Sequence, residues 1–337
     1  MLSSIVNLLP RTMQMILSQL PSQVRESIEE IRVRESRPLE IGFHDSYAFL
    51  DGNGNVTLEE LSAYKPTTAD CMSLLEMLTN HSLYTYEEEL RRGYITIAGG
   101  HRVGLAGRTV LEQGNVKQIR DVSSFNIRIA KDIVGVSNEL MPYLLDPARS
   151  TIHHTLIISP PQQGKTTLLR DIVRNVSKGN WGTDPNGISP ILSATRQCAG
   201  KKVGIVDERS ELAASSRGVP KFDVGPRTDV LDGCPKAEGM MMMIRSMSPE
   251  VLAVDEIGRP EDAAAIHEAI HAGVRIVATA HGADFEDVRM RPVLKQLLEE
   301  GVFSRYIVLD RRKQGFAPYR ILDGTGRQIQ VHRIGRG

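Results

Sequence analysis

The sequence predicts two domains, a smaller α+β domain over residues 1–140 and an α/β domain with a mostly parallel sheet over residues 141–337. Three features of the chain support this prediction. Its length of 337 residues favours more than one domain. The first part is rich in short strand patterns and contains a hairpin-type turn. From residue 155 onward, buried strand patterns alternate with helical patterns, which is typical of a parallel sheet covered on both faces.

The elements of the first domain follow from hydrophobic periodicity and turn residues. Residues 12–34 carry apolar positions at helical spacing, interrupted by Pro21, and this predicts two short helices. Residues 38–63 predict short strands joined by a turn at residues 51–54, because Asp-Gly-Asn-Gly is a strong hairpin signal. A helix follows over 68–80, and strands are expected at 94–97, 102–111 and 125–129.

The second domain has its own regular order. Strands are expected at 155–159, 203–207, 251–255, 275–280 and 305–309. Helices are expected near 166–177, 238–247, 261–272 and 286–299. The segment 178–202 is rich in Gly, Asn and Pro and predicts a long surface loop. The methionine run 240–243 predicts core packing, because methionine fills irregular gaps.

Composition limits the class of protein. Apolar residues make up 41% of the chain and charged residues 24%, as in ordinary globular proteins. The 41 basic and 41 acidic residues balance, so net charge does not favour binding to nucleic acid or to a membrane surface. Three widely spaced cysteines, Cys71, Cys198 and Cys234, suit a reducing cytosol without a structural zinc site. The N-terminal residues lack the features of a secretory signal, and no apolar run approaches the ~18 residues of a membrane helix. We expect a cytoplasmic protein, at most peripheral on a membrane.

A phosphate-binding loop is predicted between an apolar strand and a helix. It comprises Ser159, Pro160, Pro161, Gln162, Gln163, Gly164, Lys165, Thr166 and Thr167. Backbone N–H groups at the start of a helix favour phosphate, Lys165 is suited to the β- and γ-phosphates, and the Thr166 hydroxyl is suited to Mg²⁺. The full pattern has glycine where Ser159 stands, and a Cβ is tolerated there if φ is negative.

Two strands end in Asp-Glu and offer the carboxylates that a nucleotide hydrolase needs. They end at Asp207-Glu208, continuing to Glu211, and at Asp255-Glu256. Ligands bind beyond the carboxyl ends of parallel strands, so these acids are expected near the phosphate loop. We expect Asp255 to hold Mg²⁺ through water and Glu256 to orient the attacking water, with Glu208 and Glu211 assisting. Either pair alone could instead be a solvated strand end.

A third strand ends at His281. A histidine at this position is suited to sensing the γ-phosphate. A strand-end residue without a special task is the alternative interpretation.

The order of these motifs resembles the secretion-ATPase branch of the RecA-like nucleotide hydrolases, which serves type II and type IV secretion and pilus assembly. The resemblance covers residues 155 to 290: the phosphate loop, an acidic box at 207–211, the acidic strand ending at 255–256, and a histidine box at 279–281. It implies a RecA-like second domain that binds ATP and Mg²⁺. It also implies a homo-oligomer, a hexameric ring with nucleotide held between protomers.

A closer resemblance covers nearly the whole chain. Residues 99–108, 206–211, 227–232 and 238–249 resemble the stage III sporulation protein AA family of endospore-forming bacteria. This resemblance implies an ATPase of the mother cell that powers protein export or assembly of a transenvelope channel towards the forespore. Its implied partners are the membrane proteins of that channel complex, which would bring the protein to the membrane peripherally.

A nucleotide held between protomers calls for arginines that stabilise charge on the transferred phosphoryl group. Among the arginines of both domains we expect this role for Arg108, Arg128 and Arg227. Solvated arginines or arginines in salt bridges are the alternative at each position.

Three other functions remain open from the sequence. His267-Glu268-Ala269-Ile270-His271 matches the H-E-x-x-H motif of zinc hydrolases, although a helix between two strands must also pack on the sheet. A ring motor that moves nucleic acid is a second alternative. The low aromatic content, only 5% of the chain, argues against it. A scaffold that binds ATP without turnover is a third.

Overall fold

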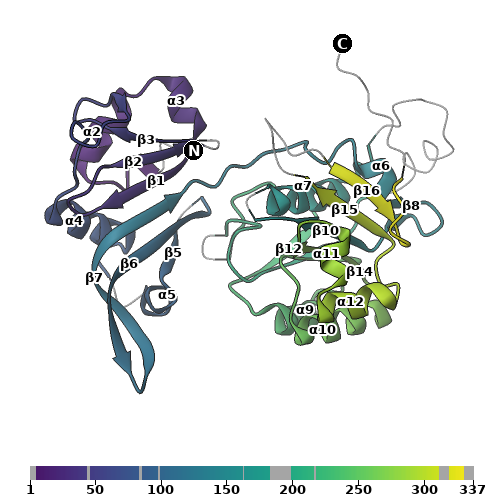
Figure 1. The fold of residues 1–337 in the computed structure, drawn as a ribbon. Coiled ribbons are helices and arrows are strands. Elements are labelled where there is room, and N and C mark those ends of the chain that lie inside the picture. Colours follow the sequence, from purple (N-terminus) through teal and green to yellow (C-terminus); the bar gives the residue numbers. More distant parts are fainter. Residues whose placement is uncertain are drawn as a thin grey trace, which may run out of the picture. The chain divides into compact units, whose positions relative to one another are not determined.

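The computed structural model describes residues 5–43, 46–82, 86–97, 99–161, 163–182, 199–215, 218–310 and 319–329. Contacts divide the chain into two compact units, Met1–Lys131 and Asp132–Gly337. Each unit has its own sheet and its own hydrophobic core (Figure 1). The predicted loop residue Gln162, Cys198 and residues 183–198 of the predicted surface loop lie outside the described residues.

The first unit contains an antiparallel sheet of seven described strands. Their order is β4-β3-β2-β1-β7-β6-β5. The strands are β1 (Ile28–Arg34), β2 (Glu40–Phe43), β3 (Ser46–Leu50), β4 (Val56–Thr57), β5 (Tyr94–Ile97), β6 (His101–Glu112) and β7 (Asn115–Arg128). Asp51 closes the predicted turn between β3 and β4, since its carboxylate accepts hydrogen bonds from the N–H groups of Asn53 and Asn55. The predicted hairpin is therefore confirmed.

Helices cover this sheet and complete its core. They are α2 (Arg11–Gln19), α3 (Ser22–Ser27), α4 (Thr68–Leu78) and α5 (Glu87–Arg92). Residues of α2 and α4, among them Met13, Ile16 and Leu74, are buried in one cluster with the strands. The predicted helical segment 12–34 is wrong in its last part, because Ile28–Arg34 forms β1. Ile28 and Ile31 have helical spacing whereas Ile31 and Val33 have strand spacing, and pairing with β2 and β7 decides for the strand.

The second unit contains a seven-stranded sheet that is parallel except at one edge. Its order is β12-β11-β13-β14-β10-β15-β16, with β16 antiparallel to β15. The strands are β10 (Thr155–Ser159), β11 (Val203–Asp207), β12 (Thr228–Asp232), β13 (Val251–Val254), β14 (Arg275–His281), β15 (Arg305–Leu309) and β16 (Tyr319–Asp323). A separate pair, β8 (Leu145–Asp146) and β9 (Thr151–Ile152), precedes the sheet. The predicted α/β fold with a mostly parallel sheet is confirmed.

Helices cover both faces of this sheet. They are α6 (Met141–Leu144), α7 (Lys165–Lys178), α9 (Lys236–Ser246), α10 (Pro260–His271), α11 (Phe285–Arg289) and α12 (Pro292–Glu299). In Figure 1, α7 lies on one face of the sheet, whereas α9, α10 and α12 lie together on the other. None of the described helices is both long enough and apolar enough to span a membrane.

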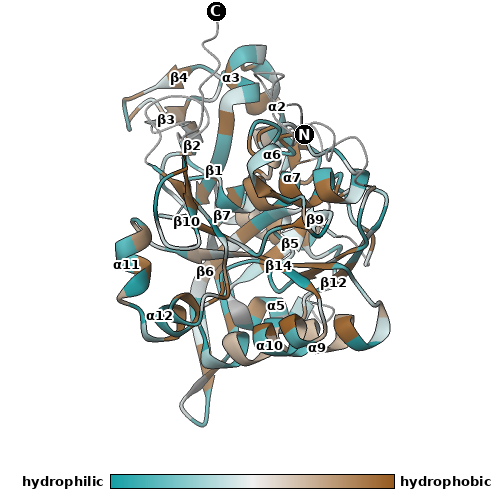
Figure 2. Cartoon of the chain, turned by 90° about the vertical axis from the view of Figure 1, so that its right-hand side faces the viewer, coloured by the Kyte–Doolittle hydropathy of each residue, from teal (hydrophilic) through white to brown (hydrophobic). Residues whose placement is uncertain are grey.

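Successive residues of each central strand face two different cores. Ile157 packs in a cluster with Leu168 and Ile172 of α7, whereas Leu156 and Ile158 pack with α9, α10 and α12. This alternation follows from the period of two in a strand. It explains the uninterrupted apolar sequence of strands covered on both faces. Figure 2 shows β10 and β14 as largely hydrophobic and α10 with residues of both kinds.

The segment that opens the second unit is fixed to α7 by one carboxylate. Asp171 is buried and accepts hydrogen bonds from the N–H groups of Gly135 and Ser137 and from the Ser137 hydroxyl at 2.8–2.9 Å. Arg174 forms an ion pair with the same carboxylate at 2.7 Å. Burial raises the pKa of Asp171, but these donors outweigh burial and lower it. Residues 132–140 therefore lie with the second unit, whereas the sequence prediction assigns them to the first.

Candidate functional site

The carboxyl ends of three neighbouring strands bring the predicted site residues together. Ser159 at the end of β10 lies opposite His281 at the end of β14 in the parallel register. The next strand, β13, ends at Val254, directly before Asp255 and Glu256. Because these strands are parallel neighbours, all of these residues lie at one edge of the sheet.

The phosphate-loop segment lies between β10, which ends at Ser159, and α7, which begins at Lys165. Gly164 has φ +90°, a left-handed conformation that glycine adopts without strain, and the helix begins at Lys165. The N-cap residue Gly164 has no side chain that could cap the first turn of α7, whose N–H groups lack partners within the helix. Ser159 is fully buried, and its φ lies outside the left-handed region. Serine therefore fits where the motif usually has glycine.

Glu256 is surrounded by a lysine, an arginine and a histidine. Its Oε1 lies 2.8 Å from Nε2 of His281 and 3.6 Å from Nζ of Lys165, and its Oε2 lies 2.8 Å from Nη1 of Arg209. Lys165 Nζ lies 3.4 Å from Nδ1 of His281. Burial raises the pKa of Glu256, but the charges of Lys165, Arg209 and His281 outweigh burial and lower it. Glu256 is therefore held in its ionised form.

Lys165 is itself buried, with only 5% of its surface exposed. Burial lowers the pKa of its ammonium group, and the neighbouring charges of Asp255 and Glu256 only partly oppose this. A buried cation with one carboxylate at 3.6 Å is a strong attractor for an anionic ligand.

Asp255 contacts hydroxyl groups, in contrast to Glu256. Its Oδ2 accepts a hydrogen bond from Thr166 Oγ1 at 2.8 Å, and its Oδ1 accepts one from Thr279 Oγ1 of β14. No lysine, arginine or histidine of the described residues forms an ion pair with it. A half-buried carboxylate without a cationic partner, beside a threonine hydroxyl, is an oxygen-only donor set of the kind that Mg²⁺ prefers.

Thr279 also fixes the backbone that carries both acids. Its hydroxyl accepts a hydrogen bond from the Glu256 N–H at 2.8 Å, and its carbonyl accepts one from Ile257 N at 2.8 Å. Glu256 has φ +55°, a conformation that costs about 1–2 kcal/mol in a residue with a Cβ. The two hydrogen bonds to Thr279 hold the chain in this turn.

The loop after β11 is organised around Asp207. Its buried carboxylate accepts hydrogen bonds from the N–H groups of Glu211, Leu212 and Ala213, each at 2.9 Å. Burial raises the pKa of Asp207 to about 6, although these donors oppose the rise. The carbonyl of Glu211 in turn accepts a hydrogen bond from Arg170 of α7 at 2.9 Å. Asp207 and Glu211 thereby shape the loop that carries Arg209.

Two predicted residues of this unit have other partners. Glu208 forms an ion pair with Lys236 at 2.8 Å and does not contact the cluster around Glu256. Arg227 donates to the carbonyl of Ser177 at 3.0 Å, near the carboxyl end of α7. Ser177 lies twelve positions after Lys165, or about 18 Å along a helix, so Arg227 is far from the phosphate loop of its own chain.

The other two predicted arginines belong to the first unit. Arg108 is exposed on β6 and lies 3.8 Å from Asp121, and Arg128 is exposed on β7 opposite Glu30 of β1. Their surface positions allow contact with another molecule but indicate no particular one.

Arg209 and Thr279 are site residues that the sequence prediction did not select. Each lies inside a predicted motif, Arg209 in the acidic box 207–211 and Thr279 at the start of the histidine box 279–281, but neither was given a role. The signal that identifies them is strand order, because β13 lies between β11 and β14 and its acids can reach both.

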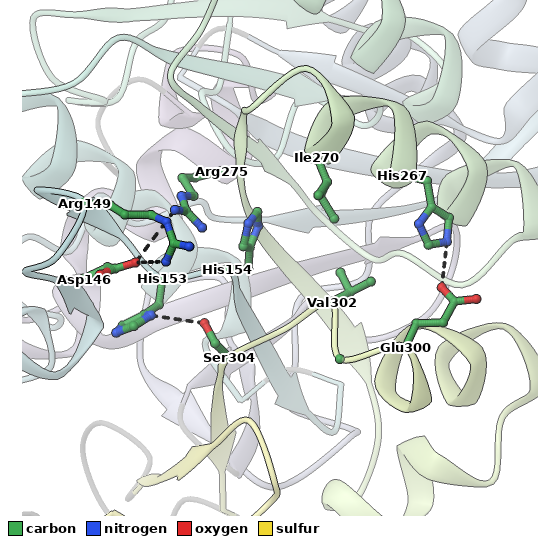
Figure 3. Close-up of a pocket in the computed structure, with 11 residues that line it drawn as sticks. Asp146, Arg149, His153, His154, His267, Ile270, Arg275, Glu300, Val302 and Ser304 are labelled. Carbon is green, nitrogen blue, oxygen red and sulfur yellow. Dashed lines mark hydrogen bonds and ion pairs between the residues drawn. The ribbon is translucent and has the colours of Figure 1, made fainter.

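The opposite edge of the second sheet contains a cavity of about 580 Å³. Its lining residues precede or begin β10, β14 and β15, so the cavity lies at the amino ends of these strands. It is lined by Asp146, Arg149, His153, His154, His267, Ile270, Arg275, Glu300, Gly301, Val302 and Ser304. Figure 3 shows Arg149 and Arg275 directed at Asp146, with distances of 3.2 and 3.7 Å. Burial lowers the pKa of both His153 and His154 to about 4, so they are neutral at pH 7.

The H-E-x-x-H sequence lies on α10 beside this cavity. Its two histidines do not share a ligand position, because His267 pairs with Glu300 at 3.0 Å and His271 is exposed. Within the part of the chain that the structure describes, no three His, Cys, Asp or Glu side chains gather closely enough to hold a metal ion. Ala265, Ile266 and Ala269 are buried, so the motif is explained by a helix that packs on a sheet.

Comparison with known proteins assigns the chain to a family. A family model described as "Sporulation stage III, protein AA" matches residues 2–329. The chain belongs to this family. Stage III sporulation protein AA of Bacillus subtilis (strain 168) is 47% identical over 325 residues, covering 96% of each chain.

Solved structures identify the fold. The Legionella pneumophila ATPase DotB matches with a TM-score of 0.53 at 14% identity, covering 93% of this chain and 79% of DotB. The pilus retraction motor PilT with bound ADP matches with a TM-score of 0.52 at 10% identity, covering 93% and 83%. This member of the sporulation family therefore has the fold of the RecA-like secretion ATPases, as its motif order predicts.

Proposed function

We propose that this protein is an Mg²⁺-dependent ATPase whose site lies at the carboxyl edge of the second sheet. The observation that carries the proposal is the convergence of Lys165, Thr166, Asp255, Glu256 and His281 from α7, β13 and β14 on one point. A lysine at the start of a helix with a glycine N-cap, beside a carboxylate suited to a metal and a second carboxylate held ionised, is the arrangement that phosphoryl transfer to water requires.

Each residue has a task that follows from its contacts. The first turn of α7 and Lys165 bind the phosphates, and the Thr166 hydroxyl and Asp255 hold Mg²⁺, Asp255 through water. Mg²⁺ held by these two residues would supply positive charge that offsets the charge of the phosphate oxygens. Glu256 accepts a proton from the attacking water and orients it, and His281, in contact with both Glu256 and Lys165, registers whether phosphate is present.

We further propose that hydrolysis powers protein export or channel assembly during sporulation, in the mother cell and through membrane partners. Family membership supports this cellular role. The fold shared with DotB and PilT supports a ring-shaped homo-oligomer, a hexamer, in which exposed arginines such as Arg108 and Arg128 reach the nucleotide of a neighbouring protomer.

The test is hydrolysis of Mg²⁺-ATP by the full chain, measured per protomer over a wide range of protein concentration. Lys165→Ala is the test variant, and Lys295→Ala, an exposed lysine on α12, is the matched control. We expect Lys165→Ala to lower the rate by at least about 100-fold, because a buried phosphate-binding cation is lost. Lys295→Ala should retain the wild-type rate.

Glu256→Gln separates binding from chemistry. It should bind Mg²⁺-ATP and hydrolyse it no faster than Lys165→Ala. Equal rates for the two lysine variants would refute the site assignment, and a wild-type protein inactive at all concentrations would refute hydrolysis. Specific activity that rises with concentration would support assembly.

A further inference from the structure

Arg209 is a cation of the candidate site that the proposed function does not use. Its guanidinium lies 2.8 Å from Oε2 of Glu256, and 47% of the side chain is exposed. Four side chains of the site lie at or just after the ends of four neighbouring strands, and Arg209 follows the strand at one end of this series. Arg209 comes from the end of β11, Glu256 from β13, His281 from β14 and Lys165 from the segment after β10.

Hydrogen bonds fix the backbone of the loop that carries Arg209, whereas, among the residues that the structure describes, the Arg209 side chain is fixed only by its ion pair with Glu256. Asp207 accepts three backbone N–H groups from the far side of the loop, and Ser210, at φ +56°, donates its hydroxyl to Asp232 at 2.7 Å. Any movement of Arg209 is therefore confined to its own flexible stem. One ion pair to Glu256 fixes where the guanidinium rests.

The same ion pair leaves Glu256 occupied. Oε1 of Glu256 faces His281 and Lys165, and Oε2 faces Arg209, so each carboxylate oxygen already has a donor or a cation beside it. A carboxylate that is stabilised by cations is a weaker base, so loss of one ion pair makes Glu256 better suited to accept a proton from water. The partner that can leave most readily is Arg209, because Lys165 is buried whereas Arg209 is half exposed.

A terminal phosphate supplies the competing acceptor. It carries more negative charge than one carboxylate, and a guanidinium binds its oxygens in a bidentate manner. Glu256 lies at the attacking side of the terminal phosphorus if the proposed function is right. A guanidinium within 3 Å of Glu256 therefore lies nearer to the terminal phosphate than to the α- and β-phosphates.

We propose that Arg209 is a specificity-determining residue that leaves Glu256 for the terminal phosphate of ATP and thereby releases Glu256 to orient water. This inference rests on the proposed function. Arg209 would make the site bind ATP more tightly than ADP. Because Arg209 leaves Glu256 only when a terminal phosphate is bound, Glu256 would act as a base only in the presence of ATP.

The experiment measures the affinity of the full chain for Mg²⁺ with ADP and with the non-hydrolysable β,γ-imido analogue of ATP. Arg209→Gln should weaken binding of the analogue by about 10- to 100-fold, the effect of one charge-assisted hydrogen bond, and leave ADP within about 2-fold. Arg209→Lys should fall between, because it keeps the charge but loses the planar fork. Arg149→Gln, an exposed arginine in an ion pair at the opposite sheet edge, is the control and should change neither affinity.

A double-mutant cycle tests the exchange of partners. Glu256→Gln frees Arg209 from its ion pair and should tighten binding of the analogue, and this gain should vanish in the Arg209→Gln background. A gain of equal size in both backgrounds would mean that only the charge of Glu256 matters, and it would overturn the inference. So would equal losses for ADP and analogue, or an Arg209→Gln protein that matches Arg149→Gln.

Lys165→Ala separates this failure from failure of the proposed function. If wild type binds the analogue, Lys165→Ala does not, and Arg209→Gln behaves as wild type, the inference fails while the proposed site stands. If Lys165→Ala binds as wild type, the proposed site fails and the inference falls with it.

Discussion

Thr279→Val tests the local structure that holds the two acids in place. The Thr279 hydroxyl is fully buried, donates to Asp255 and accepts from the Glu256 N–H at 2.8 Å. Valine keeps the branched shape and removes both hydrogen bonds. Loss of a bond to a carboxylate costs about 2 kcal/mol, and an unpaired buried N–H costs about 2 more. The added buried methyl returns about 1 kcal/mol. We expect the free energy of unfolding of the second unit to fall by about 3 kcal/mol.

Trp181 provides the assay. It is the single tryptophan of the chain and is buried in the core of the second unit, so its fluorescence follows unfolding of that unit. With a urea dependence of about 2 kcal/mol per M, the midpoint should fall by about 1.5 M. Thr279→Ser is the matched control. It keeps the hydroxyl and loses one methyl, which costs about 1 kcal/mol.

The relative order of the two variants is the decisive result. Valine must destabilise the unit more than serine if the hydroxyl matters more than the methyl. A Thr279→Val protein with the wild-type midpoint, or one more stable than Thr279→Ser, would refute the role given to the hydroxyl. Far-UV circular dichroism of both variants checks that each is folded before denaturant is added.

Two further predictions concern buried polar groups. Asp171→Asn should lower the free energy of unfolding of the second unit by about 2–4 kcal/mol in the same fluorescence assay, because an amide cannot accept all the hydrogen bonds from Gly135, Ser137 and Arg174. An unchanged midpoint would contradict the proposed anchoring of residues 132–140. His101 is 2% exposed in the first unit, and burial lowers its pKa to about 4, so the folded state keeps it neutral while the unfolded state takes up a proton below pH 6.5. The free energy of unfolding of the first unit should therefore be highest above pH 6.5 and fall by up to about 3 kcal/mol as the pH drops to 4. His101→Gln should make this free energy less dependent on pH in melts followed by circular dichroism.

The strands around the site are predicted well from sequence. The expected strands 155–159, 203–207 and 305–309 coincide with β10, β11 and β15. A parallel strand covered on both faces is a continuous apolar run, and here polar site residues mark where each run stops. The same rule fails at the edge strand β12, where Thr-Asp-Val-Leu-Asp has only two apolar residues, and the sequence predicts no strand there.

Helix predictions fail where a local interruption decides the outcome. The expected helix 286–299 is two helices, because α11 ends at Arg289 and Pro292 begins α12. Proline is favoured in the first turn of a helix and breaks one that would run through it. The methionine run, in contrast, behaves as predicted, since Met240 and Met243 are buried one turn apart on α9.

The site is predictable as far as each motif extends and no further. Lys165, Thr166 and Asp255 are recognised because each lies in a motif at the end of its own strand. Both Asp-Glu pairs end a strand, and the sequence predicts Glu256 as the base with Glu208 assisting; only the structure shows that Glu256 pairs with Lys165 and Arg209, and Glu208 with Lys236. That difference depends on which strands are neighbours, and the chain order of strands differs from their order in the sheet.

Adjacent carboxylates at the end of β13 acquire different chemistry from their neighbours. Asp255 lies between the hydroxyls of Thr166 and Thr279, so its charge remains available to a divalent cation. Glu256 lies among cations, so ligating a metal would require it to give up its ion pairs. Successive residues of an extended chain point to opposite sides, and the left-handed turn at Glu256 redirects the second carboxylate toward α7 and β11. The Asp-Glu pair therefore provides a metal ligand and a base only because β13 lies between β11 and β14, whose residues surround the two carboxylates.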